Sequence, residues 1–274
     1  MTAGKRSVQR EVVEQIVAYL RNEPLIEGAF LAGSLLDHDH DEYADVDLGI
    51  ASALGKTALQ AAYDLRHGIA AAVGAPVHHI ERGWQHCQMI ALLYGKTAFP
   101  PLGLEVDIIF SELRHVGEQM PYVPYEVVLD RSGRLKAALD RLPKEQPVDE
   151  VWASVYALGE GMPFFVHDAL KAARRGDWFY LQQVLESMRQ AIFQAAAAKN
   201  GTAVHGAKRA YRHLSQSERL VVRDSYSDDS PRSVERLAQL YVECISRVGA
   251  DHRMAAAVEQ LQRTLQEVRQ EAPR

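Results

Sequence analysis

The residues whose types and spacing most clearly suggest a chemical function are two pairs of carboxylates, Asp45 with Asp47 and Glu105 with Asp107. In each pair one apolar residue separates the acids, and the surrounding residues alternate with a period of two. This pattern predicts β-strands that carry both acids of a pair on one face. Two carboxylates about 6–7 Å apart repel each other unless a cation lies between them. Mg²⁺ suits this position because it prefers hard oxygen ligands and keeps sites open for water and phosphate.

A glycine and a serine precede the first pair. The apolar run Ala29–Ala32 ends in Gly33 and Ser34, and ten residues separate Ser34 from Asp45. The glycine allows backbone amides to approach a phosphate closely, and the serine hydroxyl adds a donor. A solitary Asp-x-Asp is more often a solvated edge strand or a turn. Together with the second acidic strand, however, these residues indicate a site for a nucleoside triphosphate and a metal.

The elements that must hold these residues are strands mixed with helices in the first half of the chain. Alternation and helical spacing predict helices at 7–22 and 56–73, and strands at 28–33, 44–51, 77–81, 88–93, 104–110 and 126–129. Ser7 is a candidate N-cap for the first helix. The expected fold class is α+β, with a small mixed β-sheet in a domain that spans residues 1–142.

The second half has helical spacing throughout, and a polar link between Pro143 and Pro147 precedes it. The helices predicted there are 150–175, 177–199, 204–213, 232–248 and 251–270. Pro163 should kink or interrupt the first of them. We therefore expect an all-α helical bundle domain over residues 148–274.

Charge and composition exclude some classes of protein. The chain has 31 Lys and Arg against 36 Asp and Glu, a net charge of −5. This balance argues against a protein that coats nucleic acid by charge alone. Cys87 and Cys244 have no metal-ligand spacing, and no apolar stretch approaches the ~20 residues of a membrane span. The absence of a secretion signal is a further reason to expect a cytoplasmic protein without a membrane or nucleic-acid partner.

Gly33-Ser34, the spacer, Asp45-x-Asp47 and the later carboxylate strand resemble the signature of the nucleotidyltransferase superfamily that includes DNA polymerase β. The order of a sheet domain and a helical bundle resembles its antibiotic-inactivating branch, the aminoglycoside and lincosamide nucleotidyltransferases. Residues 127–135 are similar to the strand-turn-helix that closes the catalytic domain of those enzymes. Residues 172–177 are similar to a helix end in their bundle.

The resemblance implies an Mg²⁺-dependent enzyme that transfers AMP from ATP, or another nucleoside monophosphate, to a hydroxyl of a small molecule such as an antibiotic. Asp45, Asp47 and Asp107 would bind the metal. In the polymerase-like relatives the third carboxylate is a metal-binding aspartate, whereas in the antibiotic enzymes a glutamate before valine is the general base. Glu105 matches the second pattern and Asp107 the first, so the identity of the base stays open. The implied partners are the nucleoside triphosphate and the acceptor, and a homodimer is compatible with this interpretation.

In the bundle, Lys208 and Tyr211 resemble a segment near the nucleotide in the streptomycin-modifying relatives. Lys208 and Arg212 would be i,i+4 neighbours on a helix, which gives a cationic face for a triphosphate. A solvated basic helix face is the alternative.

A different class of function is a regulatory nucleotidyltransferase that modifies a protein partner, as in toxin–antitoxin pairs. Those antitoxins resemble the first half alone, so the fused bundle favours a self-contained enzyme.

Overall fold

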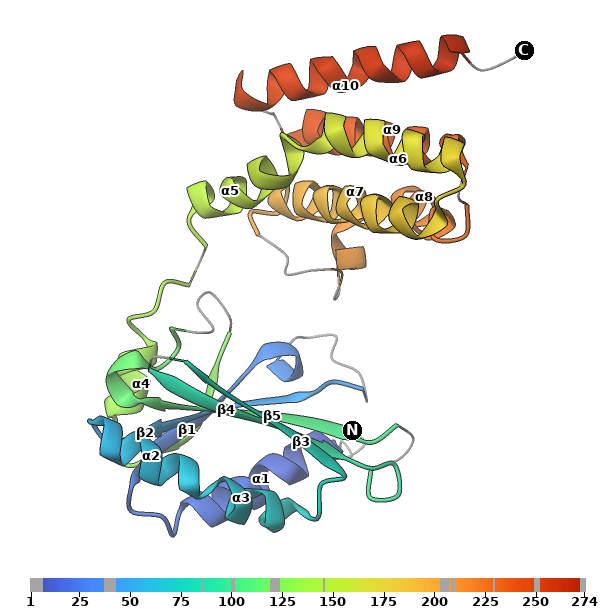
Figure 1. The fold of residues 1–274 in the computed structure, drawn as a ribbon. Helices are drawn as coiled ribbons and strands as arrows, with labels where there is room; N and C mark the ends of the chain where they lie inside the picture. Colours follow the sequence, from blue (N-terminus) through green and yellow to red (C-terminus); the bar gives the residue numbers. More distant parts are fainter. Residues whose placement is uncertain are drawn as a thin grey trace, which may run out of the picture. The chain divides into compact units, whose positions relative to one another are not determined.

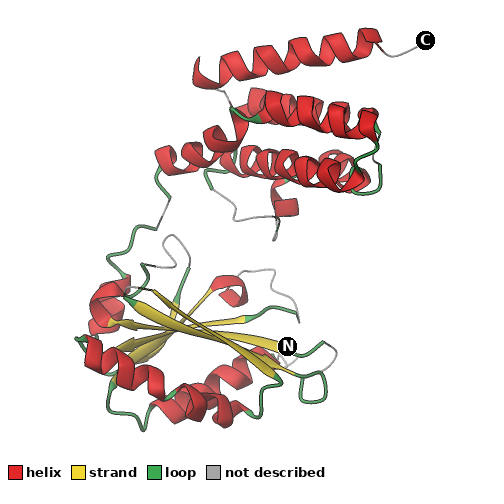
Figure 2. Ribbon diagram, in the orientation of Figure 1, coloured by secondary structure: helices red, strands yellow, loops and turns green. Residues whose placement is uncertain are grey.

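A computed structural model describes residues 7–36, 43–84, 86–99, 102–118, 124–144, 146–202, 207, 210–228, 230–248 and 252–271. The chain forms two compact units, Met1–Glu145 and Gln146–Arg274. The first contains a β-sheet with helices, and the described part of the second contains helices without strands (Figures 1 and 2). The α+β class expected from the sequence is confirmed.

The first unit is built on a six-stranded sheet with the order β3-β4-β5-β2-β1-β6. Its strands are β1 (Ile26–Ala32), β2 (Val46–Ser52), β3 (His78–Trp84), β4 (Cys87–Tyr94), β5 (Leu104–Glu112) and β6 (Glu126–Asp130). Strands β2 and β5 are parallel, and the other neighbouring pairs are antiparallel. The mixed sheet predicted from the sequence is therefore present, and its parallel pair joins the two strands that carry the acidic residues.

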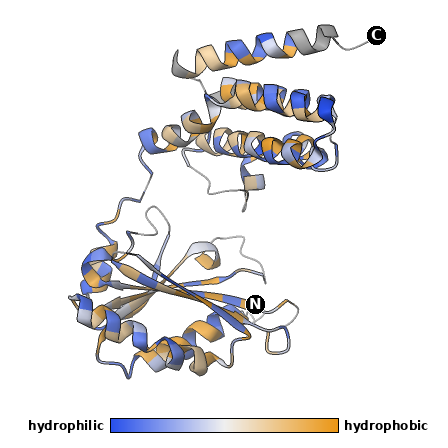
Figure 3. Ribbon diagram, in the orientation of Figure 1, coloured by the Kyte–Doolittle hydropathy of each residue, from blue (hydrophilic) through white to orange (hydrophobic). Residues whose placement is uncertain are grey.

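Three helices cover one face of this sheet, namely α1 (Val8–Leu20), α2 (Lys56–Asp64) and α3 (Arg66–Val73) (Figure 1). Every second residue of β2 and β5, for example Val46 and Val106, is buried in the core that these helices form with the sheet. The alternation along the strands can be followed in Figure 3. On the other face, α4 (Arg134–Leu139) packs against Phe30 and Ala51. Because successive side chains point to opposite faces, Asp47 and Asp107 lie opposite the three-helix layer.

The prediction of one helix over residues 56–73 is wrong, because α2 and α3 meet at Leu65. The break directs α3 onto α1. A Cβ built on Gly68 would lie only 2.1 Å from the Tyr19 hydroxyl oxygen, so the two helices approach closely at this glycine. Helical spacing continues on both sides of the break and therefore does not reveal it. The predicted cap of α1 is confirmed, since the Ser7 hydroxyl accepts a hydrogen bond from the Arg10 amide at 3.3 Å.

The second unit consists of α5 (Val148–Gly159), α6 (Met162–Arg175), α7 (Trp178–Ala198), η3 (Ala210–His213), α8 (Gln216–Asp224), α9 (Pro231–Val248) and α10 (His252–Glu271). The interruption predicted at Pro163 is present, and this proline lies in the first turn of α6, where no intrahelical amide donor is lost. None of the described helices combines the length and apolarity needed to cross a bilayer.

The helix predicted over 204–213 is wrong in its described part, because residues 210–213 form a single 3₁₀ turn. A regular helix, α8, begins just after it and was not predicted. The Ser215 hydroxyl accepts a hydrogen bond from the Glu218 amide, and the Glu218 carboxylate accepts one from the Ser215 amide at 2.6 Å. This reciprocal capping box is visible in the sequence as Ser-x-x-Glu, a signal from which α8 could have been predicted.

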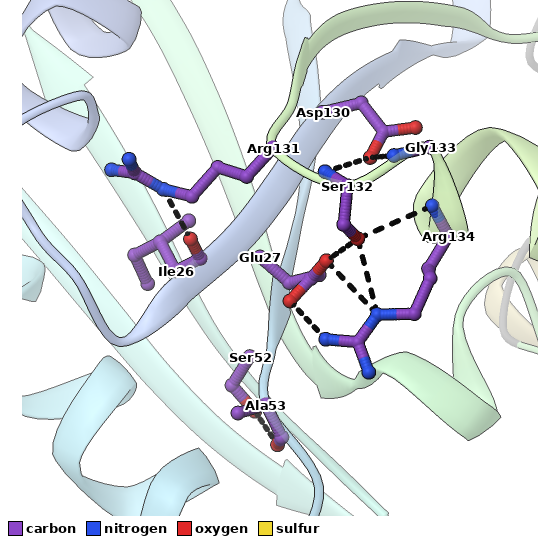
Figure 4. Close-up of polar contacts among 9 residues, drawn as sticks. All are labelled: Ile26, Glu27, Ser52, Ala53, Asp130, Arg131, Ser132, Gly133 and Arg134. Carbon is purple, nitrogen blue, oxygen red and sulfur yellow. Dashed lines mark hydrogen bonds and ion pairs between the residues drawn. The ribbon is translucent and has the colours of Figure 1, made fainter.

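A cluster of polar contacts joins the turn after β6 to strand β1 (Figure 4). The Glu27 side chain is 10% exposed and accepts hydrogen bonds from Arg134 Nη2 at 2.5 Å, from Arg134 Nε at 3.2 Å and from the Ser132 hydroxyl. Arg131 Nε donates to the carbonyl oxygen of Ile26 at 2.8 Å. These bonds fix the strand-turn-helix segment against the sheet.

This cluster should make stability depend on pH. The hydrogen bond from Arg134 lowers the pKa of Glu27 from its ordinary value. A carboxyl whose pKa is lower in the folded state stabilises the fold above its unfolded pKa, and this contribution is lost as pH falls through the folded pKa. We expect Glu27→Gln to flatten the decrease in unfolding free energy between about pH 5 and pH 3. Urea unfolding over this range tests it, with Glu11→Gln on the exposed side of α1 as control. An unchanged pH dependence in Glu27→Gln would contradict the expectation.

Candidate functional site

The parallel pairing of β2 with β5 places Asp47 directly beside Asp107. Asp47 lies opposite Ala32 on β1, and Asp107 lies opposite Ala91 on β4. Registered residues on neighbouring strands point to the same face, and the strands are about 5 Å apart. Both side chains are half-buried. Each acidic pair was predicted to share a face within its own strand, and the structure adds this closer pair between strands.

Gly33 brings the turn after β1 against Asp47. The glycine begins the 3₁₀ turn η1 (Gly33–Leu36) with a φ of +70°, in the left-handed region that favours glycine. A Cβ built on Gly33 would lie 2.1 Å from Asp47 Oδ2 and 2.8 Å from Asp47 Cγ. The Asp47 carboxylate therefore occupies the space that any other residue would fill. Ser34, on the same turn, is half-buried.

Gly33→Ala should displace the Asp47 carboxylate as well as strain the backbone. The left-handed φ alone should destabilise the fold by about 1–2 kcal/mol. Gly133 has a φ of +77° and space around it, with nothing within 4 Å of a built Cβ, so Gly133→Ala is a matched control for strain. Chemical unfolding should show losses of stability of similar size in both variants. Assays of nucleotidyl transfer, the activity expected from the sequence, should show the larger loss of rate in Gly33→Ala. Equal activity in the two variants would contradict a role for the contact with Asp47.

The remaining two acids lie toward the start of the strands. Asp45 is half-buried and lies one residue before β2, so this strand begins later than the predicted start at residue 44. Glu105 is exposed on β5, opposite Leu93 of β4. It shares a face with Asp107 because the two residues are two positions apart along the strand. The structure thus brings Asp47 and Asp107 together and leaves Glu105 at the solvent-exposed end of the same face.

The surface next to these acids is partly apolar, which the sequence did not reveal. In the row of Asp107 the register places Ala91 on β4 and then Ile80 on β3, whose side chain is 47% exposed. Leu93, beside Glu105, is 44% exposed, and Arg82, two residues after Ile80 on β3, is exposed as well. Both strands were predicted, but the register that carries their side chains to the acids depends on turn geometry and packing.

The two predicted nucleotide contacts of the bundle have different outcomes. Lys208 lies outside the described residues. Tyr211 is on η3 in the second unit, and its ring is 52% exposed, with the Arg219 guanidinium carbon 5.2 Å from the ring centroid. Arg219 Nε also donates to the Tyr211 carbonyl oxygen at 2.8 Å. An α-helical cationic face around Arg212 is not formed in the described residues 210–213.

Asp47 and Asp107 form a donor set that fits Mg²⁺. Within the described ranges, no three His, Cys, Asp or Glu side chains are grouped so that they could hold a metal by themselves. A closed structural site of the zinc type is therefore not formed by those residues. Mg²⁺ needs fewer protein ligands, since one or two carboxylates bind it together with water and substrate phosphates. The adjacent aspartates beside the Gly33 turn meet this requirement.

Comparisons with known proteins give distant similarities. No family model and no curated protein matches the sequence. Among solved structures, the chain is similar to an aminoglycoside 6-adenyltransferase from Bacillus subtilis, with 12% identity and a TM-score of 0.36 over 97% of this chain and 99% of that chain. It is also similar to a nucleotidyltransferase-like protein from Exiguobacterium sibiricum 255-15, with 11% identity and a TM-score of 0.35 over 96% of this chain and 80% of that chain. These values are too low for either structure to indicate the activity of this chain.

Proposed function

We propose that this chain is a nucleotidyltransferase that transfers a nucleoside monophosphate, AMP from ATP, to a hydroxyl of a small molecule. The observation that carries the proposal is the adjacency of Asp47 and Asp107 on parallel strands, with Gly33 packed against the Asp47 carboxylate. A triphosphate bound through a metal needs carboxylates close to its phosphates. It also needs a turn at which backbone amides can approach the phosphates, and glycine permits this approach.

Each acidic residue has a separate role in this proposal. Asp47 and Asp107, with Asp45 at the start of β2, would bind Mg²⁺. When bound, Mg²⁺ neutralises the charge that develops on the transferred phosphoryl group. Gly33 and Ser34 would hold the β- and γ-phosphates, and Glu105 would accept the proton of the acceptor hydroxyl. Lys208 and Tyr211 are proposed as further contacts to the nucleotide. Because the reaction uses ATP, we assign the enzyme to the cytoplasm.

The proposed acceptor is an antibiotic, and the charge of the chain favours a weakly charged one such as a lincosamide. Residues 151–274 contain 17 Lys and Arg against 14 Asp and Glu, a net of +3. Beside the acids, Ile80 and Leu93 expose apolar side chains, and Arg82 adds a positive charge. A pocket for a polycation such as an aminoglycoside should instead be ringed with carboxylates.

Incubation of the chain with Mg²⁺, labelled ATP or GTP and a panel of antibiotics tests both levels of the proposal. We expect mass spectrometry to detect a nucleoside monophosphate on a lincosamide, and no adduct when Mg²⁺ is chelated. Strong modification of a polycationic aminoglycoside without modification of lincosamides would overturn the acceptor preference alone. The absence of transfer to every acceptor, from either nucleotide, would count against the proposed activity.

A further inference from the structure

A groove in the first unit lies at the carboxyl ends of β2 and β5, away from the acidic residues. It has a volume of about 450 Å³, and its walls come from α4, from Leu54 after β2 and from the segment that follows β5, which includes the 3₁₀ turn η2 (Leu113–His115). Asp47 precedes the last residue of β2, Ser52, by five positions, which corresponds to about 16 Å along the strand. The groove and the row of acids therefore lie toward opposite ends of the same two strands.

The residues that line the groove carry a net positive charge, although the unit that contains them is acidic. Three arginines, Arg114, Arg134 and Arg141, and one carboxylate, Glu118, line it, which gives a net of +2. Residues 1–150 as a whole contain 14 Lys and Arg against 22 Asp and Glu, a net of −8. Glu118 is itself paired with His115 at 2.8 Å. An excess of guanidinium groups in one concave site of an acidic unit favours an anionic ligand.

Two of the arginines are held in place by carboxylates behind them. Arg134 is bound by Glu27, as Figure 4 shows, and Arg114 Nη2 lies 3.1 Å from Glu112 Oε2. The Glu112 side chain is only 2% exposed and also accepts a hydrogen bond from the Gly55 amide at 2.9 Å. A guanidinium has five N–H donors, so these contacts orient each group and leave donors for a ligand.

Arg141 differs from the other two. In the described part of the chain its side chain is exposed and has no hydrogen bond or ion pair. The groove also has an apolar lining, which includes the buried side chains of Leu113 and Val116 and the Leu54 side chain, 61% exposed. The site thus combines cationic groups with apolar surface.

We propose that this groove binds a small organic anion with an apolar body, a site separate from the acidic residues. Arg141 and Arg114 bind its carboxylate or phosphate group, and Leu54 and Leu113 contact its body. Guanidinium groups recognise both kinds of anion through paired N–H donors. A volume of about 450 Å³ lies within the range of small-molecule sites.

Calorimetric titration of the full chain with phenyl phosphate, benzoate and phenol, in EDTA at low salt, tests the proposal. EDTA removes the metal through which the acidic residues would bind phosphate, so the proposed transferase activity plays no part in the measurement. We expect saturable binding of phenyl phosphate, of benzoate or of both, and none of phenol at the same concentration. The arm that binds more tightly identifies the acidic group. Leu54→Ala should weaken the binding of the anion that carries the phenyl ring and leave the affinity for inorganic phosphate unchanged.

Arg141→Ala should weaken the binding of phenyl phosphate or benzoate at least about tenfold, since a charged hydrogen-bonding group is lost. Arg21→Ala, an exposed arginine at the end of α1 that does not line the groove, is the matched control and should bind like the wild type. Arg141→Lys keeps the charge without the paired donors and should fall between them. Absence of saturable binding to the wild type, or equal affinities of Arg141→Ala and Arg21→Ala, would overturn the proposal.

Discussion

Replacement of Asp47 by asparagine should lower kcat/KM for nucleotidyl transfer by at least about a hundredfold and leave the fold intact. Its carboxylate lies against Gly33 and beside Asp107, at the centre of the proposed site. The amide keeps the shape of the side chain and loses the charge that would bind Mg²⁺. Adjacent carboxylates repel each other without a cation, so removal of one charge should leave the metal-free unfolding free energy unchanged or slightly higher.

Kinetics and urea unfolding of the same preparations separate these two effects. Wild-type chain should be stabilised by ATP with Mg²⁺, because a ligand that binds the native state raises its unfolding free energy, and Asp47→Asn should lose most of this stabilisation. Asp64→Asn, an exposed aspartate on α2, is the control for a neutralised carboxylate in the same unit. Asp45→Asn should change activity in the same direction as Asp47→Asn. Turnover near the wild-type rate in Asp47→Asn would exclude this residue from the metal site.

The strands could be predicted because one face of each is buried. Val46 and Leu48 on β2, and Val106 and Ile108 on β5, are all buried in the core below the three helices, so alternation in the sequence reports a real difference between faces. The order of the strands could not be predicted in the same way. Pairing of β2 with β5 joins segments far apart in the chain, and packing of the whole sheet determines that pairing.

The helices show a similar limit. Spacing alone does not distinguish one helix over residues 56–73 from two that meet at Leu65, because packing of Gly68 against Tyr19 determines the direction of α3. The segment 204–213 has helical spacing, but the stronger local signal is the capping box at Ser215, which starts α8. Side-chain capping satisfies amides that spacing does not take into account.

For the candidate site, the sequence indicated the residue types and the structure supplies their neighbours. The expectation that glycine is needed before Ser34 has a specific reason in the structure, since the Asp47 carboxylate fills the space of a Cβ. The neighbour of Asp47 across the strands was not predictable, because it depends on the register of β2 with β5. The sequence suggested that Asp107 could lie deeper than Glu105 but left this open, and the exposure of the two side chains now distinguishes them.

Glu105→Gln and Asp107→Asn should therefore lower nucleotidyl transfer for different reasons. Asp107 is half-buried next to Asp47, so its replacement should weaken Mg²⁺-dependent binding of ATP as well as turnover. Glu105 is exposed two residues earlier on the same face, where an acceptor can reach it. Loss of a general base lowers the rate by about 10²–10⁴-fold, while metal and nucleotide should still bind.

Calorimetric titration with ATP, with and without Mg²⁺, and single-turnover rates for the same variants distinguish the two roles. Glu105→Gln should bind ATP with nearly the wild-type affinity and turn over slowly, whereas Asp107→Asn should lose the increase in affinity that Mg²⁺ gives. Glu11→Gln on α1 controls for the loss of an exposed carboxylate. If Glu105→Gln keeps a rate within a few-fold of the wild type, the proton must go elsewhere. Asp107 would then be the third carboxylate by itself, and its position beside Asp47 would be the part of β5 that the reaction needs.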